Sequence, residues 1–186
     1  MKRLPLVTLA LVLANLLAYL VERAAGGEAF CEAHGLVPAR FMRSGDLGPI
    51  FSQMFLHDPS GLGHIAGNMA FLAVFGALVE RAVGPARFLV VYMAAGVAGA
   101  LMHVLVDPAA TDPLVGASGA IFGVLAVAAV ARPRLSVFVA AFFGLNVWHA
   151  FFGGGGDVSF GDHIGGFAVG FLFVLLAHRS ACLEVA

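Results

Sequence analysis

The sequence has few charged side chains. Only 11% of its 186 residues are Asp, Glu, Lys or Arg, whereas 61% are hydrophobic. Soluble domains carry about 25% charged residues, so this composition excludes a soluble globular protein and indicates one that lies in a membrane. The formal net charge of −1 offers no basic surface, and we expect no nucleic-acid partner. We expect residues 1–186 to form one membrane domain without a separate soluble domain.

Cysteine is scarce, and several hydrolase motifs are missing. Cys31 and Cys182 fall on opposite membrane sides in the topology below, so we expect no disulfide between them. The sequence has no H-E-x-x-H motif, and we expect no metal and no cofactor. Residues 154–157 match the G-x-G-D string of aspartyl intramembrane proteases, but no second Asp lies in the middle of an apolar run. The G-x-S-x-G elbow also fails, because Ala120 replaces its last glycine.

Long apolar runs take the place of charge. They predict an all-α, polytopic membrane protein with six helices, which cover residues 4–21, 62–83, 86–106, 115–131, 135–152 and 159–177. Three breaks separate the later runs, at Gly84-Pro85, Arg132-Pro133-Arg134 and Gly153 to Gly156. The connection over residues 22–61 contains apolar stretches of its own, so we expect it to fold back onto the membrane surface.

Basic residues set the expected orientation. An even number of spans puts both ends of the chain on one side, and that side holds Lys2, Arg3, Arg81, Arg87, Arg132, Arg134 and Arg179. Basic residues favour the cytoplasmic side. We therefore expect a multi-pass protein of the bacterial plasma (inner) membrane, with both termini in the cytoplasm and the outer ends of the helices carrying the site described next.

One serine stands out by its position. Ser118 follows the turn-prone residues 107–113 and opens an apolar run that ends at Ala131, about 14 residues long and shorter than the ~20 needed to cross a bilayer. We expect this serine below the membrane surface, at the end of a buried helix that lines a cavity. His163 opens the sixth run in the same way. A buried serine with a buried histidine suggests a nucleophile and its base, although His163 alone could be a satisfied polar residue near the interface.

Further polar and aromatic residues share faces with this pair. His64 and Asn68 lie one turn apart on one face near the outer end of the second run. Both side chains can donate hydrogen bonds, which suits an oxyanion hole; the alternative is a polar contact between membrane helices. Phe122 lies one turn below Ser118. Its ring could pack against the His163 imidazole, or it could be an ordinary core or lipid-facing ring.

Small residues follow both the serine and the histidine at helical spacing. They are Gly119 and Gly123 in the fourth run, and Gly166 and Gly170 in the sixth. Such small-xxx-small faces let membrane helices approach closely. If these two faces pack together, the serine and the histidine come within hydrogen-bond reach.

Together these motifs resemble the rhomboid intramembrane serine proteases over residues 36–178. The segments that carry the resemblance are Gly116–Gly123, His64-x-x-x-Asn68, His163 with Gly166 and Gly170, Phe55-Leu56-His57, and Glu80-x-x-x-Gly84-Pro85-x-Arg87-Phe88. The resemblance implies a six-helix rhomboid-like bundle and a serine endopeptidase that cleaves single-span membrane proteins within the lipid bilayer. It implies Ser118 as the nucleophile, His163 as the general base and acid, and an oxyanion hole of His64, Asn68 and the Ser118 backbone N–H.

The sequence departs from the family in two places. Asp162 stands next to His163, where the family often has a small residue. Adjacent side chains on a helix do not face each other, so we expect Asp162 to alter the hydration or acidity of the site rather than orient His163. The Trp-Arg pair of some members is missing from the first long loop, where Arg40-Phe41 comes nearest.

Other readings remain open at this stage. The fifth run and the glycines after it form either a lateral gate for substrate or an aromatic interface belt with a linker, and they include Phe142, Phe143, Trp148, Phe151, Phe152 and Gly153 to Gly156. The alternative function is a catalytically silent rhomboid-like protein that binds membrane clients, but both the serine and the histidine are present. A transporter would spread its polar residues toward the midplane, whereas here they cluster at one end.

Overall fold

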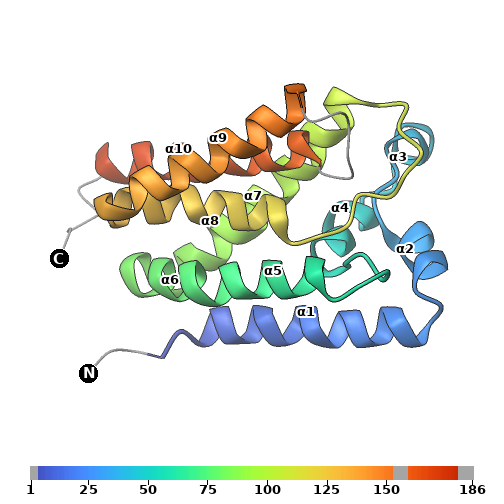
Figure 1. Cartoon of the computed structure of the whole chain (residues 1–186), viewed down its shortest axis with the longest axis horizontal. Coiled ribbons are helices and arrows are strands. Elements are labelled where there is room, and N and C mark those ends of the chain that lie inside the picture. The colour runs from blue at the N-terminus through green and yellow to red at the C-terminus, as the bar shows by residue number, and fades with distance from the viewer. Residues whose placement is uncertain (1–3, 153–158, 180–186) are drawn as a thin grey trace.

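The structure is a computed structural model that describes residues 4–152 and 159–179. Within that part of the chain every regular element is a helix (Figure 1), which confirms the all-α prediction. In chain order the elements are α1 Leu6–Ala24, α2 Glu28–His34, α3 Pro38–Ser44, α4 Gly48–Ser52, η1 Gln53–Phe55, α5 Gly63–Phe71, η2 Leu72–Gly76, α6 Ala77–Val83, α7 Pro85–Val106, α8 Ser118–Ala131, η3 Pro133–Leu135, α9 Ser136–Phe152 and α10 Phe160–Arg179.

Four helical segments of the described chain are long and apolar enough to cross a membrane. They are Leu6–Ala24, Gly63–Val83, Pro85–Val106 and Phe160–Ala177, and two shorter apolar helices cover Ser118–Ala131 and Pro133–Trp148. The second of the four runs continuously through α5, η2 and α6, with a π-helical stretch in its middle. The chain is therefore an integral, multi-pass membrane protein.

The helices end where the sequence breaks predict. Gly84 lies between α6 and α7 with a φ of 86°, a left-handed conformation that a side chain would strain, and Pro85 takes the first position of α7. Arg132 ends α8 and precedes Pro133, which cannot continue a helix. The predicted break at Gly153 to Gly156 lies outside the described residues, as does Cys182.

Helix α8 forms the centre of the bundle. Every residue from Gly119 to Ala128 is buried, and Figure 1 shows this helix in the middle, between α5 and α6 on one side and α9 and α10 on the other. A helix that is apolar all round belongs in an interior. The predicted short buried helix is therefore present, and it begins at Ser118 as expected.

Helices α8 and α10 meet at the level of their backbones. A Cβ atom on Gly166 would collide with the carbonyl oxygen of Gly119, and one on Gly170 would collide with that of Gly123. Only glycine on α10 leaves room for these carbonyl groups, and neither backbone can yield without moving its whole helix. The two small-residue faces thus bring the first turns of α8 and α10 together.

Helix α1 is fastened to this core by one carboxylate. Buried Glu80 accepts hydrogen bonds from the backbone N–H groups of Val7 (3.1 Å) and Thr8 (2.7 Å), and from the Thr8 hydroxyl (2.7 Å). These N–H groups belong to the first turn of α1, where no intrahelical acceptor exists and the helix dipole favours a negative charge. The carboxylate satisfies them and fixes where α1 sits against α6.

The long connection after α1 is folded and packs onto the bundle. Leu36 pairs with Leu114 through two backbone hydrogen bonds of 3.2 and 2.9 Å, so the connection is tied to the segment that precedes α8. Leu36 and Ile50 are buried together with Ala100 and Val104 of α7. The connection therefore folds back onto the bundle, and its packing sets the position of the chain entering α8. Its contact with the membrane surface stays a prediction.

Replacing Gly166 by Val should destabilise the protein. The branched side chain would have to displace the Gly119 carbonyl, and overpacking of this kind costs about 1–3 kcal/mol. We expect a lower melting temperature in detergent. Gly144→Val is the matched control, because Gly144 is exposed on α9 and a Cβ there meets open space. Equal melting temperatures for the two variants would contradict the close contact between α8 and α10.

Candidate active site

The chain turns sharply before Ser118. Gly116 has a φ of 134°, and a Cβ atom on it would lie 2.9 Å from Nε2 of His64 and 3.7 Å from Oγ of Ser118. Glycine is therefore required there both for its conformation and for space. The Gly116 N–H donates to the carbonyl oxygen of Gln53 (2.9 Å), which holds the turn against η1. Ser118 then opens α8 with its side chain half-buried.

His163 lies in the first turn of α10 and is buried. Its imidazole stacks on the Phe122 ring, with 4.1 Å between the ring centroids and 20° between the planes. Phe122 is one turn below Ser118 on α8, so this contact restrains the orientation of the imidazole at the serine end of that helix. The Nδ1 atom of His163 has no hydrogen-bond partner.

Two residues hold the start of α10. The Ser159 hydroxyl accepts a hydrogen bond from the N–H of Asp162 (3.4 Å), the arrangement of an N-cap. The same hydroxyl lies 2.6 Å from Nδ1 of His103, on the last turn of α7. This contact ties the beginning of α10, with Asp162 and His163, to α7 and gives His103 a structural role.

The hydrogen bonds of His64 define which ring nitrogen carries its proton. Nδ1 accepts the backbone N–H of Asp58 (3.1 Å). In the neutral imidazole the proton must then sit on Nε2, the nitrogen that lies close to Gly116. His64 thus presents an N–H donor at the turn that leads into Ser118. Asn68 is partly committed elsewhere, because its amide donates to the carbonyl oxygen of His64 (3.0 Å) and keeps one further N–H.

The Ser118 hydroxyl donates its hydrogen bond to Asp162. The Oγ–Oδ2 distance is 3.2 Å. Spacing along one helix does not predict this contact, because it relates Asp162 only to residues of the same helix, such as His163. The residues in the sequence that could have indicated this contact are two glycines on other helices. Cβ atoms on Gly99 of α7 or Gly119 of α8 would collide with the Asp162 carboxyl. They leave a niche that a carboxyl group fills, so the acid faces the serine rather than the imidazole.

A second polar cluster lies behind His64. His57 is fully buried, its ring centroid is 5.1 Å from that of His64, and both of its ring nitrogens lack hydrogen-bond partners. Its backbone is well held, because the His57 N–H donates to Glu22 (2.9 Å) and the Cys31 thiol donates to the His57 carbonyl (3.5 Å). Burial raises the pKa of the Cys31 thiol to about 12, so this cysteine is an unreactive packing group.

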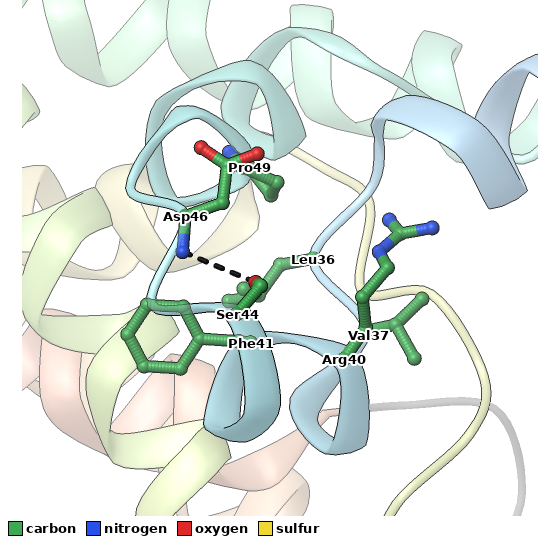
Figure 2. Close-up of a pocket in the computed structure, with 7 residues that line it drawn as sticks. All are labelled: Leu36, Val37, Arg40, Phe41, Ser44, Asp46 and Pro49. Atoms are coloured by element: carbon green, nitrogen blue, oxygen red, sulfur yellow. Dashed lines mark hydrogen bonds between the residues drawn. The ribbon is translucent and has the colours of Figure 1, made fainter.

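Other sequence candidates lie elsewhere. His34 contacts the Phe30 ring at the end of α2, and the side chains of His149 and His178 lie outside the described residues. In the described part of the chain, no group of three or more His, Cys, Asp or Glu side chains is arranged to hold a metal ion. Figure 2 shows a surface pocket of about 140 Å³ between α3 and α4, and none of the site residues above lines it.

Aromatic rings of α9 cover the side of the site. Phe142 stacks on Phe71 of α5 (4.9 Å between centroids) and on Phe122 of α8 (5.6 Å). Phe143 packs against Phe167 of α10 (4.3 Å). Helix α9 thereby closes the bundle between α5 and α10 through ring contacts. Of the residues expected in a gate, those at 153–156 lie outside the described residues.

The fold and the site define a class of protein. It is a helical membrane protein with a half-buried serine, a stacked histidine and a histidine N–H donor at one end of its bundle. The rhomboid domain matches residues 44–180 of this chain. The chain therefore belongs to the rhomboid family, as its motifs had indicated.

Three proteins illustrate the similarity. The chain is 32% identical over 124 residues to the rhomboid protease GluP of Bacillus subtilis (65% of this chain, 24% of that protein). It is 33% identical over 91 residues to RHOMBOID-like protein 5 of Arabidopsis thaliana (49% of this chain, 29% of that protein). It is 35% identical over 85 residues to the YdcA protein of Bacillus subtilis (45% of this chain, 41% of that protein). The chain thus matches less than half the length of each.

Acid should destabilise the protein through His57. Burial, with a smaller effect of His64, lowers the pKa of His57 from 6.5 to about 4. Between these two pH values the unfolded chain binds more protons than the folded one. The part of the folding free energy that depends on uncharged His57 is therefore fully present above about pH 6.5. This part, on the order of 3 kcal/mol, is lost as the pH falls toward 4.

The melting temperature in detergent, measured from pH 7.5 to 4.5, should therefore fall less steeply for His57→Phe than for the unmodified chain. His34→Phe, which removes an exposed imidazole, should leave the slope unchanged. A His57→Phe slope equal to that of the unmodified chain would show that the buried imidazole does not govern acid stability.

Proposed function

We propose that this chain is an intramembrane serine endopeptidase that cleaves the transmembrane segments of single-span membrane proteins. The observation that carries the proposal is the donor from His64: its Nε2–H lies close to Gly116, in the turn that leads into Ser118, at the end of the bundle where α8 and α10 begin. A serine with an adjacent preorganised N–H donor and a restrained imidazole on the neighbouring helix is the arrangement that acyl transfer needs.

Ser118 is the proposed nucleophile and His163 its general base. Oγ of Ser118 would attack the substrate carbonyl while His163 takes the hydroxyl proton, and His163 would then return that proton to the leaving amine. Stacking on Phe122 supports this role, because a ring held in one plane keeps its nitrogen directed at one partner. Water would release the acyl group with His163 acting again as base.

The oxyanion of the tetrahedral intermediate would be held by three donors. They are Nε2–H of His64, the second amide N–H of Asn68 and the backbone N–H of Ser118. The Ser118 N–H belongs to the first turn of α8, so it lacks an intrahelical acceptor and points along the positive end of the helix dipole. Donors fixed in a site shielded from water stabilise such a charge by several kcal/mol in total.

The membrane arrangement is part of the proposal. The two shorter apolar helices would complete a six-helix rhomboid bundle with the four long ones. The distribution of basic residues favours cytoplasmic termini, and the proposed location is a bacterial plasma (inner) membrane. The site would then open to the outer side. A substrate helix must unwind before its carbonyls can be attacked, and it would enter where the Phe142 ring stacks between α5 and α8 if α9 moves aside.

Ser118 should react with a fluorophosphonate probe in detergent. Ser118→Ala should lose both labelling and cleavage of single-span substrates while the protein still folds, because only one half-buried hydroxyl is removed. His163→Ala should lower the rates of labelling and of cleavage by at least ~10³-fold, because the serine then has no general base. Equal labelling of the Ser118→Ala protein would refute the assignment. A chain that binds membrane proteins but shows neither labelling nor cleavage would be the silent client-binding protein instead.

Removing both side-chain donors should abolish most turnover. Loss of one oxyanion donor lowers kcat by ~10²-fold or more, and the backbone N–H that remains could mask a single substitution. His64→Ala with Asn68→Ala is therefore the decisive variant, measured as kcat at unchanged melting temperature. Gln53→Ala is a matched control, since Gln53 holds the neighbouring turn through its backbone carbonyl. Near-normal turnover of the double variant would mean that both residues only join helices.

A further inference from the structure

Asp162 is an acidic residue placed inside the catalytic end of the bundle. It has no solvent exposure. Its carboxyl occupies the niche that Gly99 of α7 and Gly119 of α8 leave open, so three helices enclose it. Buried carboxyl groups within membrane helices are costly and are usually tied to function. The Oδ1 atom of Asp162 has no hydrogen-bond partner, which means that packing alone does not account for the acid.

The hydrogen bond from Ser118 to Asp162 excludes the one that catalysis needs. A serine hydroxyl has a single proton to donate, and here that proton is directed at Oδ2 of Asp162. To pass the proton to His163, the hydroxyl must first turn away from the acid. The carboxyl of Asp162 therefore competes with the imidazole for the one hydrogen bond that the nucleophile can donate.

The carboxyl of Asp162 also lies where the reaction builds up negative charge. It lies against Gly119, in the first turn of α8. That turn supplies the Ser118 N–H and the positive end of the helix dipole, which stabilise an anion. A carboxyl group at the same helix end places its oxygen atoms where a developing oxyanion needs donors, so it disfavours the charge that the reaction creates.

We propose that Asp162 is a positioning residue that holds the Ser118 hydroxyl in a resting orientation, away from His163. The proposal rests on the proposed function of Ser118 and His163. In the resting protein the carboxyl accepts the hydrogen bond of the serine hydroxyl and occupies the helix end. The serine becomes reactive only when its hydroxyl leaves the carboxyl for the imidazole, so the acid restrains the nucleophile without touching substrate.

The proposal predicts that removal of the carboxyl increases the rate at which the Ser118 hydroxyl reacts. Asp162→Ala should increase the rate of fluorophosphonate labelling on the order of tenfold. Asp162→Asn, which keeps the shape and a weaker neutral acceptor, should lie between it and the unmodified chain. With a single-span substrate kcat should rise by the same factors at unchanged KM, because Asp162 makes no substrate contact. A merely structural role would lower stability and rate together, and would never raise the rate.

The experiment compares labelling rates of the full chain in detergent for the unmodified protein, Asp162→Ala, Asp162→Asn, Ser118→Ala and Asp112→Asn. Asp112→Asn is the matched control, because it removes an exposed carboxylate from the loop before α8. It should label at the unmodified rate. If Asp162→Ala does not fold, the nearly isosteric Asp162→Asn decides the outcome.

Two failures can be told apart. Labelling that persists in Ser118→Ala, or that is absent from the unmodified chain, overturns the proposed function and the role of Asp162 with it. Labelling that depends on Ser118 but is no faster in folded Asp162→Asn overturns the role of Asp162 alone. An equal rise in the Asp112→Asn control also overturns it, since the effect would then be one of overall charge.

Discussion

The close approach of α8 and α10 is the constraint on which the rest of the structure depends. In a bilayer, lipid tails are as apolar as leucine, so helices associate through tight packing rather than through the hydrophobic effect. Gly166 and Gly170 let α10 rest on the carbonyl groups of Gly119 and Gly123. This contact aligns the first turns of the two helices and buries α8 on all sides. The stacking of Phe122 on His163 follows from it.

Buried polar groups serve two different ends in this bundle. Glu80 is fully used, since three hydrogen bonds from the start of α1 surround its carboxylate. Asp162 and His57 are equally buried but leave polar atoms without partners. Burying an unpaired polar atom costs free energy, so Asp162, whose carboxyl accepts a hydrogen bond from Ser118 but leaves Oδ1 without a partner, does not add to stability as Glu80 does.

Membership in the rhomboid family and the local geometry support the proposed protease from separate directions. The family match covers residues 44–180 and depends on sequence, whereas the proton position on His64 depends on its contact with Asp58. The second observation is chemical, because it places a donor rather than an acceptor beside Ser118. The hydrogen bond to Asp162 adds a restraint that neither the family match nor the motifs imply.

The sequence by itself determined the helices and the residue types of the site. Run length and charge predicted an all-α membrane protein, Pro85 and Pro133 marked helix starts, and the 14-residue α8 begins at the predicted serine. Only the tertiary structure decided which side chains meet. Ser118 and Asp162 are 44 positions apart in the sequence. Their contact depends on which faces α7, α8 and α10 turn toward one another, because those faces leave the niche that the carboxyl fills. Periodicity gives the faces of one helix, but the packing of three helices chooses the partners.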